Sequence, residues 1–511
     1  SYLRQVDARN RQLDGTEGWY IPSQQGCGLV LTIDAEIQEM VEKAMRECIE
    51  VNQAQSVICL VSDVKTGAIL AMCMNPCYDP NDPPRDDAET LTELMRLTAI
   101  SDVYEPGSTF KILTAASALD SGVTTPQDSF YCSAKITVDG DTIRCWGRPH
   151  GAETMADGLK NSCNPVFVEL ALRMGTDTFY RYLTAFGLGK KTGIDLPGES
   201  PGILITSRNV KRVDLARIGF GQSVALTPIQ MMMAANSVIN GGKLMKPYIV
   251  SEIQTPDGET LERFHPTVMA APIRPETSDT MRLLLERVVS EGGGKNAAIA
   301  GYRIGGKTGT AQVYKNGRVV RDTHIGSFYG FAPVNDPQVS ILVIVKEADV
   351  PIDYGGTTAA PFARQIMQEM LPYLGIDPEN DKKDEEIEVP ALKGLTIGDA
   401  KRKLSQVGLE SVTDGANTVV LDQLPPAGAK LVKGGHVMLY TAGSEELTPE
   451  ELVCVPDLTG LGDVDCARLV RQRGLTMSMT GQGLCTEQSP AAGEYVQPGT
   501  TIFLLMAGDD E

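Results

Sequence analysis

The chain has 511 residues, which is too long for one hydrophobic core and predicts two to four domains. Hydrophobic residues make up 42% and charged residues 22%, as in an ordinary globular protein. The formal net charge of −20 excludes an ordinary nucleic-acid binder, because no surplus of basic side chains is available to neutralise phosphates. Apolar runs such as Val339–Val345 are far shorter than the roughly 20 residues of a membrane span, and the start of the chain does not read as a signal peptide.

Residues 29–47 predict a short strand followed by a helix that Asp34 caps, because apolar residues recur at helical spacing after it. Two β-type runs come next, Val57–Val61 and Ala68–Met72, and the turn residues 63–67 between them predict a hairpin. Residues 108–119 have helical propensity and come directly after Pro-Gly.

Eleven cysteines are present without a Cys-x-x-Cys pair or a Cys/His ligand spacing, so the sequence does not predict a zinc site. Cys132 and Cys145 flank a predicted hairpin with its turn at Asp139-Gly140. A disulfide between them and two separate thiols are both open at this point. Buried free thiols are expected for the other cysteines.

A change of composition after residue 375 divides the chain. Residues 375–388 are dense in charge and predict an exposed linker. An internal repeat comes after it, because residues 389–409 align with 455–475 and residues 423–435 align with 488–500. Each copy starts with Val-Pro-x-Leu-x-Gly, continues as a helix and ends in alternating strands such as Val437–Tyr440 and Ile502–Leu505, which predicts two small β-α-β domains.

A serine nucleophile is the chemistry that the motifs favour. The Ser-His-Asp arrangement is disfavoured, because only four histidines are present and no Gly-x-Ser-x-Gly elbow occurs. The alternative is a serine followed three residues later by a lysine on the same helix face, with the lysine as base once burial or a neighbouring cation lowers its pKa. In β-lactamases and penicillin-binding proteins this pair precedes a Ser-x-Asn-type element and a Lys-Thr-Gly element.

Each of these elements occurs more than once, and local context separates the copies. Ser62–Lys65 lies in the hairpin, whereas Ser108–Lys111 opens a helix. Ser162-Cys163-Asn164 ends a helical stretch just before Pro165, whereas Ser207-Arg208-Asn209 lies in a polar stretch without such a bend. The sequence therefore favours Ser108, Lys111, Ser162 and Asn164.

Lys-Thr-Gly occurs three times, at residues 65–67, 191–193 and 307–309. The first copy is the hairpin turn and the second lies in a Gly/Pro-rich loop. Only Lys307-Thr308-Gly309 comes after paired glycines, leads into a predicted strand and precedes a further threonine, Thr310. This copy is the predicted wall of the active site.

In these motifs and their order the chain resembles the class B penicillin-binding proteins, the monofunctional peptidoglycan D,D-transpeptidases. The similar segments, from about residue 29 to 508, include LTIDAEIQ, TGAILAM, NPCYDPN, YEPGSTFK, SCNPVF, GFGQSVALTPIQ, GGKTGTAQ, FYGFAPV and YGGTTAAPFA. The two repeats resemble PASTA domains of Gram-positive division-type and sporulation-type members.

The resemblance implies a multidomain α+β fold, with an antiparallel sheet flanked by helices and an all-α part, as in serine β-lactamases. It divides the chain into a pedestal remnant (1–28), a transpeptidase domain (29–375), a linker (376–387) and two PASTA domains (388–443 and 449–509). It also implies that a membrane anchor and most of the pedestal are missing from this sequence, that the protein acts at the outer face of the bacterial membrane, and that a separate glycosyltransferase polymerises the glycan.

The resemblance further implies roles for individual residues. Ser108 would attack the carbonyl between two terminal D-alanines, Lys111 would take its proton, Ser162 would relay it, and Asn164 would orient Lys111. Lys307, Thr308, Gly309 and Thr310 would hold the substrate carboxylate, with the charge of Lys307 helping to keep Lys111 neutral. The backbone N–H groups of Ser108 and Thr310 would form the oxyanion hole. β-Lactams would acylate Ser108, and no cofactor is implied.

Several points of this interpretation leave alternatives open. Cys163 stands where the family usually has Asp, and its thiol is expected to point into the wall of the site rather than to be redox-sensitive. A D,D-carboxypeptidase or β-lactamase, in which water resolves the acyl-enzyme, is the alternative enzyme, although no convincing deacylating Glu is found. A sensor of β-lactams or wall fragments is the alternative outside enzymes. The process served, division or sporulation, and the role of the repeats, binding or bracing, stay open.

Overall fold

The computed structural model describes residues 2–3, 8–9, 19–20 and 25–507, apart from 148, 316–317, 379–386, 414–417, 432–434, 442–452, 482, 491, 493–494 and 497–498. Most of the predicted pedestal remnant and of the predicted linker therefore lies outside the described residues. Across the described part of the chain, no helix combines the length and the apolarity that crossing a bilayer requires.

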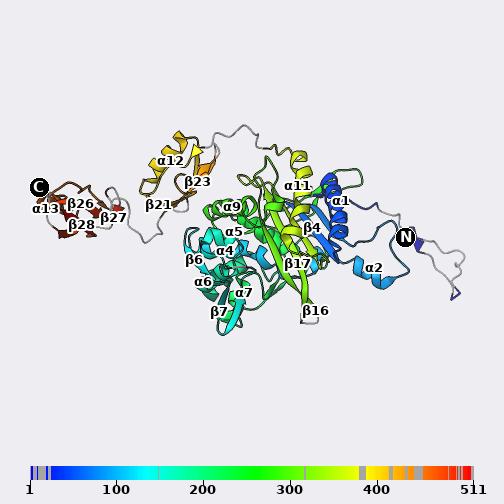
Figure 1. Cartoon of the computed structure of the whole chain (residues 1–511). Helices are drawn as coiled ribbons and strands as arrows, with labels where there is room; N and C mark the ends of the chain where they lie inside the picture. The colour runs from blue at the N-terminus through cyan, green and yellow to red at the C-terminus, as the bar shows by residue number, and fades with distance from the viewer. Residues whose placement is uncertain are drawn as a thin grey trace.

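A five-stranded antiparallel sheet is the centre of the largest domain (Figure 1). Its strand order is β16-β17-β18-β4-β5, formed by Gly305–Lys315, Arg318–Ala332, Val339–Lys346, Ser56–Asp63 and Ile69–Asn75. The predicted hairpin of residues 57–72 is confirmed as β4 and β5. Because β16 is the edge strand, one row of its backbone groups faces away from the sheet.

Both faces of this sheet are buried, which explains its continuous apolar runs. In β4, Ile58 and Leu60 point into one hydrophobic core, while Val57, Cys59 and Val61 point into the other. The first core, which contains Ile58, lies under four helices: α4 (Lys111–Asp120), α6 (Asn164–Ala185), α8 (Pro228–Ile239) and α9 (Pro275–Ser290). The second core, which contains Val57, lies under α1 (Ala35–Asn52) and α11 (Ala360–Tyr373). This is the predicted sheet flanked by helices with an all-α part.

Two sequence predictions of helix starts can be compared with the backbone. The carboxylate of Asp34 accepts hydrogen bonds from the N–H groups of Glu36 and Ile37, so the predicted cap of α1 is confirmed. The helix predicted for 108–119 begins instead as a 3₁₀ turn, Gly107–Phe110 (η1), and becomes α-helical only at Lys111. The tighter turn lets residue 108 stand at the end of the helix, beside the edge strand β16.

Short elements surround the first core. The predicted hairpin between Cys132 and Cys145 is confirmed as β7 and β8, with Asp139 and Gly140 at positive φ. The remaining elements of this domain are β3 (Gly28–Leu31), α2 (Ala88–Leu94), α3 (Thr98–Ser101), β6 (Ser129–Cys132), β7 (Lys135–Val138), β8 (Asp141–Arg144), β9 (Gly151–Thr154), α5 (Met155–Lys160), β10 (Ile203–Leu204), α7 (Arg212–Ile218), β11 (Val224–Ala225), β12 (Leu244–Met245), β13 (Val250–Gln254), β14 (Thr260–Arg263), β15 (Val268–Ala270), η2 (Lys295–Ala297) and α10 (Gly355–Thr358). Tyr2–Leu3 (β1) and Trp19–Tyr20 (β2) pair with each other.

The internal repeat forms two small units of the same topology, here called repeat 1 and repeat 2. Each contains one helix and a three-stranded sheet in which the first and last strands are parallel. Repeat 1 comprises β19 (Ile387–Glu388), α12 (Ile397–Gln406), β20 (Glu410–Thr413), β21 (Val420–Leu424), β22 (Lys430–Leu431) and β23 (His436–Thr441). Repeat 2 comprises β24 (Val453–Cys454), α13 (Asp463–Gln472), β25 (Thr476–Gly481), β26 (Leu484–Ser489), β27 (Tyr495–Val496) and β28 (Thr501–Ala507).

Repeat 1 packs against the largest domain, and β23 supplies the contact. Val437 and Leu439 point into the core of repeat 1, whereas Met438 and Tyr440 point the other way and are also buried. The Oγ1 atom of Thr280 on α9 lies 3.6 Å from the sulfur of Met438. Tyr440 lines a small pocket together with Leu119, Arg274, Thr277, Thr280 and residues 124–126 of the largest domain.

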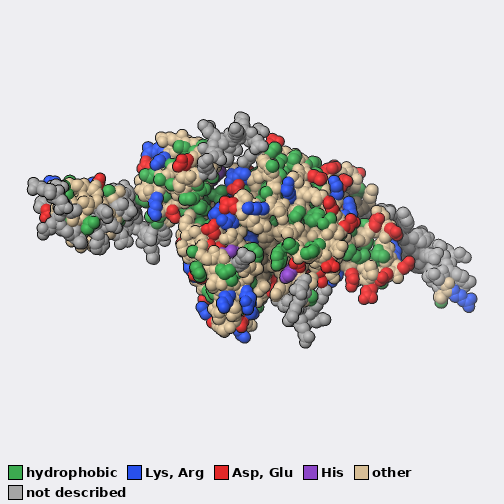
Figure 2. All heavy atoms as spheres, viewed as in Figure 1, with side chains coloured by type: hydrophobic (Ala, Val, Ile, Leu, Met, Phe, Trp, Pro, Cys, Tyr) green, Lys and Arg blue, Asp and Glu red, His purple; other side chains and the backbone are tan. Residues whose placement is uncertain are grey.

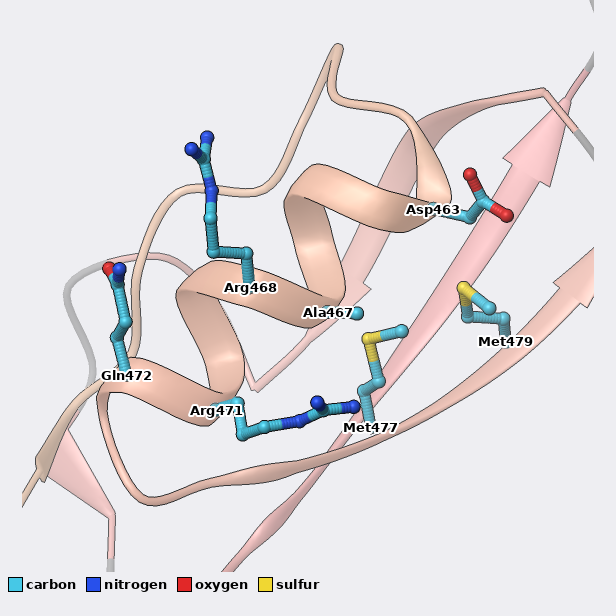
Figure 3. A pocket seen from close by; sticks show the side chains of 7 residues that line it. All are labelled: Asp463, Ala467, Arg468, Arg471, Gln472, Met477 and Met479. Carbon is cyan, nitrogen blue, oxygen red and sulfur yellow. The ribbon is translucent and has the colours of Figure 1, made fainter.

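The surface of repeat 2 carries a hollow of about 710 Å³ beside α13 and β25 (Figure 3). Arg471 reaches toward Met477 in this hollow, whereas Arg468 points the other way. On the face of the whole chain that Figure 2 shows, acidic side chains gather around α2, and Lys and Arg side chains are interspersed with them elsewhere. This distribution agrees with the net charge of −20.

Candidate active site

A cleft of about 810 Å³ lies between η1, the end of α5, the start of α6 and the edge strand β16. Ser108, Ser162, Asn164, Thr308 and Thr310 all line it. The fold therefore brings together predicted residues that lie up to 202 positions apart in the sequence.

Ser108 is half-buried in the second position of η1. The residue before it, Gly107, has φ +53°, and a Cβ atom there would lie 2.5 Å from the backbone oxygen of Thr310. Only glycine fits this position without displacing β16. The close approach brings the backbone of Ser108 beside that of Thr310, the two groups predicted to supply the oxyanion hole.

Lys111 begins α4 one turn after Ser108 and is fully buried. Its Nζ atom donates hydrogen bonds to the backbone oxygen of Ser162 at 2.6 Å, to Ser162 Oγ at 3.1 Å and to Asn164 Oδ1 at 2.7 Å. The same nitrogen lies 5.3 Å from the centre of the Phe167 ring. Lys111 is therefore held by groups from a different part of the chain, which fixes its orientation.

Ser162 and Asn164 occupy the turn that joins α5 to α6. Ser162 has φ +56°, in the left-handed region that residues other than glycine rarely adopt, and this conformation reverses the chain within a single residue. Pro165 lies in the first turn of α6, where its missing N–H is not needed. The predicted bend is confirmed, and it directs the side chains of Ser162 and Asn164 toward Lys111.

Lys307 lies on β16, with its side chain fully buried. Its Nζ atom donates to Ser162 Oγ at 2.9 Å and to the backbone oxygen of Thr308 at 3.0 Å. Of the three Lys-Thr-Gly copies, this one therefore meets the predicted serine-lysine pair.

Gly309 lets β16 approach η1. A Cβ atom at this position would lie 2.3 Å from Ser327 Oγ, 2.9 Å from Thr109 Cγ2 and 3.0 Å from the backbone oxygen of Pro106. Any side chain at residue 309 would push β16 away from η1, and with it Thr308 and Thr310. The glycine of the tripeptide is thus required by packing.

Burial lowers the pKa of both lysines. Desolvation brings the pKa of Lys111 down to about 7, although nearby Cys145, Cys163 and Glu153 oppose the shift. Burial lowers the pKa of Lys307 well below its ordinary value, and repulsion from Lys111 adds to the effect. The sequence interpretation assigned the like-charge effect to Lys111; in the structure, burial is the main cause there, and the repulsion acts on Lys307.

The competing motif copies have other environments. Ser62 is buried in β4, and Lys65 forms an exposed ion pair with Asp336 at 2.7 Å, so this pair does not form a site. Thr192 and Gly193 of the second tripeptide donate hydrogen bonds to the carboxylate of Glu199 in a loop. Residues 207–209 form an exposed turn. These copies therefore lie apart from the cleft that Ser108, Ser162 and Thr308 line.

Several cleft residues were not found from the sequence. Trp146, His324 and Tyr354 line the cleft, and His324 Nδ1 lies 2.8 Å from a carboxylate oxygen of Asp353. Tyr354 lies in the segment YGGTTAAPFA, whose only signal was its similarity to the family. No local spacing links these residues to Ser108, because they lie far from it in the sequence, on β17 and in two loops, and the tertiary fold brings them together.

A cluster of four further side chains lies beside the cleft, and one of them, His150, lines it. Ligand atoms of Cys132, Cys145, His150 and Cys163 are all within 4.8 Å of one another. Cys132 and Cys145, whose pairing the sequence left open, are free thiols in the structure, and Cys163 is fully buried, as expected. A hydrogen bond from Cys163 lowers the pKa of Cys145 to about 5, and the pKa of Cys163 is raised.

Comparison with known proteins identifies the family. The model of the penicillin binding protein transpeptidase domain matches residues 57–368, and the PASTA domain model matches residues 387–443 and 453–508, which are repeats 1 and 2. Stage V sporulation protein D of Bacillus subtilis (strain 168) is 37% identical over 452 residues, which cover 86% of this chain and 69% of that protein. Peptidoglycan D,D-transpeptidase FtsI of Escherichia coli (strain K12) is 30% identical over 358 residues, covering 70% of this chain and 58% of FtsI.

A solved structure supports the same assignment. Penicillin binding protein 3 from Mycobacterium tuberculosis, complexed with aztreonam, matches with a TM-score of 0.65 and 27% identity over 73% of this chain and 88% of that chain. The expected fold class is confirmed by this match together with the two PASTA domains. The chain belongs to the penicillin-binding protein transpeptidases and carries two C-terminal PASTA domains.

Proposed function

We propose that this protein is a peptidoglycan D,D-transpeptidase that forms an acyl-enzyme on Ser108. The observation that carries the proposal is the meeting of Lys111, Lys307 and Asn164 around Ser162, at the edge of the cleft that Ser108 lines. A buried lysine with a pKa of about 7 is neutral in a large fraction of molecules at neutral pH, as a general base must be.

In the acylation step, Ser108 Oγ attacks the carbonyl carbon between the two terminal D-alanines of a stem peptide, and its proton moves to Lys111 Nζ. Lys111 then returns this proton to Ser162 Oγ while Ser162 passes its own hydroxyl proton to the nitrogen of the departing D-alanine, so that both residues are restored as the peptide bond breaks. An amine from a second stem peptide then attacks the Ser108 ester. The amine loses a proton to the same lysine-serine pair, and the Ser108 hydroxyl is restored as the cross-link forms.

The substrate is held by β16. Lys307, Thr308 and Thr310 would bind the terminal carboxylate, and this adjacent anion would raise the pKa of Lys307. The backbone N–H groups of Ser108 and Thr310 would stabilise the oxyanion. A β-lactam carries a carboxylate and a strained amide in a comparable arrangement and would acylate the same oxygen.

The alternative functions differ in the fate of the acyl-enzyme. In a D,D-carboxypeptidase or β-lactamase, water would release the acyl group quickly, and in a sensor the acyl-enzyme would persist without an acceptor. The two PASTA domains and the relatives named as transpeptidases favour an amine acceptor. One relative is named for sporulation and another is named FtsI, and both division and sporulation stay open as the process that this protein serves.

The place of action and the partner are inferred from the substrate. Stem peptides lie outside the cytoplasmic membrane, so the catalytic domain works on the extracytoplasmic side. A membrane anchor outside this sequence would hold it there, and a separate membrane glycosyltransferase would supply the glycan strands.

Labelling with fluorescent penicillin tests the nucleophile. We expect label on the wild type and on Ser62→Ala, which removes the competing serine, and no label on Ser108→Ala. Intact-protein mass spectrometry should give one acyl adduct per chain, located on Ser108. Label retained by Ser108→Ala would disprove the assignment.

Release of the acyl group separates the alternatives. We expect the penicilloyl-enzyme to persist over many minutes in buffer, and a D-Ala-D-Ala peptide to be transferred to an added amine in preference to water. Rapid hydrolysis of penicillin by the wild type would favour the β-lactamase interpretation instead.

A further inference from the structure

Three cysteines and one histidine from separate segments converge beside the cleft, which His150 also lines. Cys132 ends β6, Cys145 comes directly after β8, His150 precedes β9, and Cys163 lies between Ser162 and α6. The four ligand atoms lie within 4.8 Å of one another. Thiol and imidazole groups in this number are the ligands that bind zinc in structural sites.

The distances are close to those of a tetrahedral site. With Zn–S bonds of about 2.3 Å and Zn–N bonds of about 2.05 Å, neighbouring ligand atoms in a tetrahedron are about 3.6–3.8 Å apart. Cys145 Sγ lies 3.8 Å from His150 Nδ1. The widest separation in the cluster exceeds the ideal edge by about 1 Å at most, which side-chain rotation can remove.

A carboxylate beside the cluster gives a second indication of a cation. The side chain of Glu153 is buried, and its Oε2 atom accepts a hydrogen bond from Asn161 at 3.1 Å. Its Oε1 atom is buried and lies 3.7 Å from His150 Nδ1, and the Cys163 thiol also interacts with this carboxylate. A buried carboxylate beside thiol and imidazole groups is costly to desolvate, and a divalent cation held by those groups would compensate its charge.

We propose that Cys132, Cys145, His150 and Cys163 form a Cys₃His binding site for one Zn²⁺ ion. Soft thiolates with one imidazole favour Zn²⁺ over Mg²⁺ or Ca²⁺, which prefer oxygen ligands. Glu153 then lies in the outer shell of the ion. Binding releases the thiol protons to solvent, and no redox step is involved.

The site would connect the metal to catalysis through one residue. Cys163 stands between Ser162 and Asn164, which both hold Lys111. A zinc–sulfur bond to Cys163 would fix this turn, in which Ser162 has the left-handed conformation that residues other than glycine rarely adopt. The metal therefore acts as a positioning element for Ser162 and Asn164.

Metal content of the full chain tests the proposal. The protein is purified with a non-thiol reductant, dialysed with equimolar ZnCl₂ and analysed by inductively coupled plasma mass spectrometry. We expect one zinc per chain. Replacement by Co²⁺ should give thiolate-to-cobalt charge-transfer bands in the near ultraviolet and the intense visible bands of tetrahedral cobalt. Neither readout depends on acylation of Ser108, so failure of this proposal is distinguishable from failure of the proposed function.

Variants locate the ion. Cys145→Ser should abolish stoichiometric zinc binding, and Cys59→Ser, at a buried thiol in β4, should retain it. Cys163→Ser could unfold the turn, so His150→Ala, at the partly exposed edge of the cluster, is measured alongside and should weaken cobalt binding by about tenfold or more. Glu153→Gln should weaken it by roughly 10–100-fold while the tetrahedral spectrum persists.

Three results would overturn the proposal. The first is a folded, reduced wild type that takes up no zinc. The second is zinc binding that Cys145→Ser and His150→Ala leave intact, because the ion would then lie elsewhere. The third is a disulfide between two of the three cysteines in protein purified without reductant in the presence of zinc, found by peptide mapping after alkylation, because it would leave too few ligands.

Discussion

Lys111 and Lys307 donate hydrogen bonds to the same atom, the Oγ of Ser162, at 3.1 and 2.9 Å. A hydroxyl oxygen has two lone pairs, and these two lysines occupy both. The hydroxyl proton of Ser162 must then point elsewhere, and the cleft that Ser162 lines is the open side. The arrangement gives a physical basis for a proton relay through Ser162. It also places two buried amines where repulsion disfavours two full charges.

The rate of acylation should depend on pH through Lys111. Its pKa of about 7 means that it is mainly protonated below pH 7 and mainly neutral above. Because only the neutral amine can accept the proton of Ser108, the second-order rate constant for penicillin should fall by about tenfold per pH unit below pH 7. Above pH 8 it should be level. Stopped-flow measurements with a chromogenic β-lactam between pH 5.5 and 9 would provide the profile.

Circular dichroism over the same pH range serves as the control, because the fold must be unchanged for the profile to report on Lys111. A rate independent of pH across this range would contradict the assignment of Lys111 as the base.

Binding of a carboxylate ligand should take up a proton at Lys307. Burial, with repulsion from Lys111, lowers the pKa of this lysine well below its ordinary value, which favours its neutral form before the ligand arrives. The ligand carboxylate raises that pKa. We expect penicillin binding to Ser108→Ala, which cannot be acylated, to take up as much as one proton at pH 7. Calorimetric titration in two buffers of different ionisation enthalpy measures it.

The matched variant for this experiment is Ser108→Ala combined with Lys307→Met. It should bind penicillin more weakly and without proton uptake. Equal uptake in both proteins would assign the proton to another group.

Replacing Gly309 by Ala should reduce acylation through packing alone. The new Cβ would lie 2.3 Å from Ser327 Oγ and 3.0 Å from the backbone oxygen of Pro106, so β16 must shift. Overpacking of this kind costs roughly 1–3 kcal/mol of folding free energy, and a misplaced Thr310 should lower the acylation rate about 100-fold. Gly398→Ala, whose nearest contact would be 3.9 Å away in α12, is the control and should leave both unchanged. Normal acylation by Gly309→Ala would refute the packing argument.

Much of the candidate active site could be predicted because its motifs carry local context. The bend before Pro165 and the glycines before Lys307 are chain-neighbour effects, and they separate the motif copies at the cleft from Lys65 and from residues 191–193. The β4–β5 hairpin and the cap at Asp34 were predictable for the same reason. Local physics dictates these features, so a single sequence contains them.

Other features depend on distant packing and left no local signal. The 3₁₀ start at Gly107 results from the close approach of Thr310. The cluster around Cys163 combines segments that share no ligand spacing, which is why a zinc site was not expected from the sequence. The contact of repeat 1 with α9 could not be predicted either, because both repeats have the same sequence pattern of apolar residues and only one of them makes the contact among the described residues.

The contact of repeat 1 with α9 distinguishes two strands that are otherwise equivalent, β23 of repeat 1 and β28 of repeat 2. Tyr440 on β23 and Leu505 on β28 occupy the same position of the repeat. Tyr440 is 6% exposed against the largest domain, whereas Leu505 is 46% exposed. The same strand face is therefore buried in repeat 1 and open to solvent in repeat 2.

We expect Tyr440→Glu to destabilise the protein and Leu505→Glu to leave it almost unchanged. A carboxylate at residue 440 must either be buried without a partner or separate repeat 1 from α9, at a cost of roughly 2 kcal/mol or more, whereas an exposed substitution stays within about 0.5 kcal/mol. Differential scanning calorimetry of the full chain, with penicillin labelling to follow the catalytic domain, measures both. If repeat 1 braces that domain, the label should be lost at a lower temperature in Tyr440→Glu only. Equal midpoints for the two variants would mean that the contact contributes no bracing, and the function of repeat 1 would then have to be sought in binding.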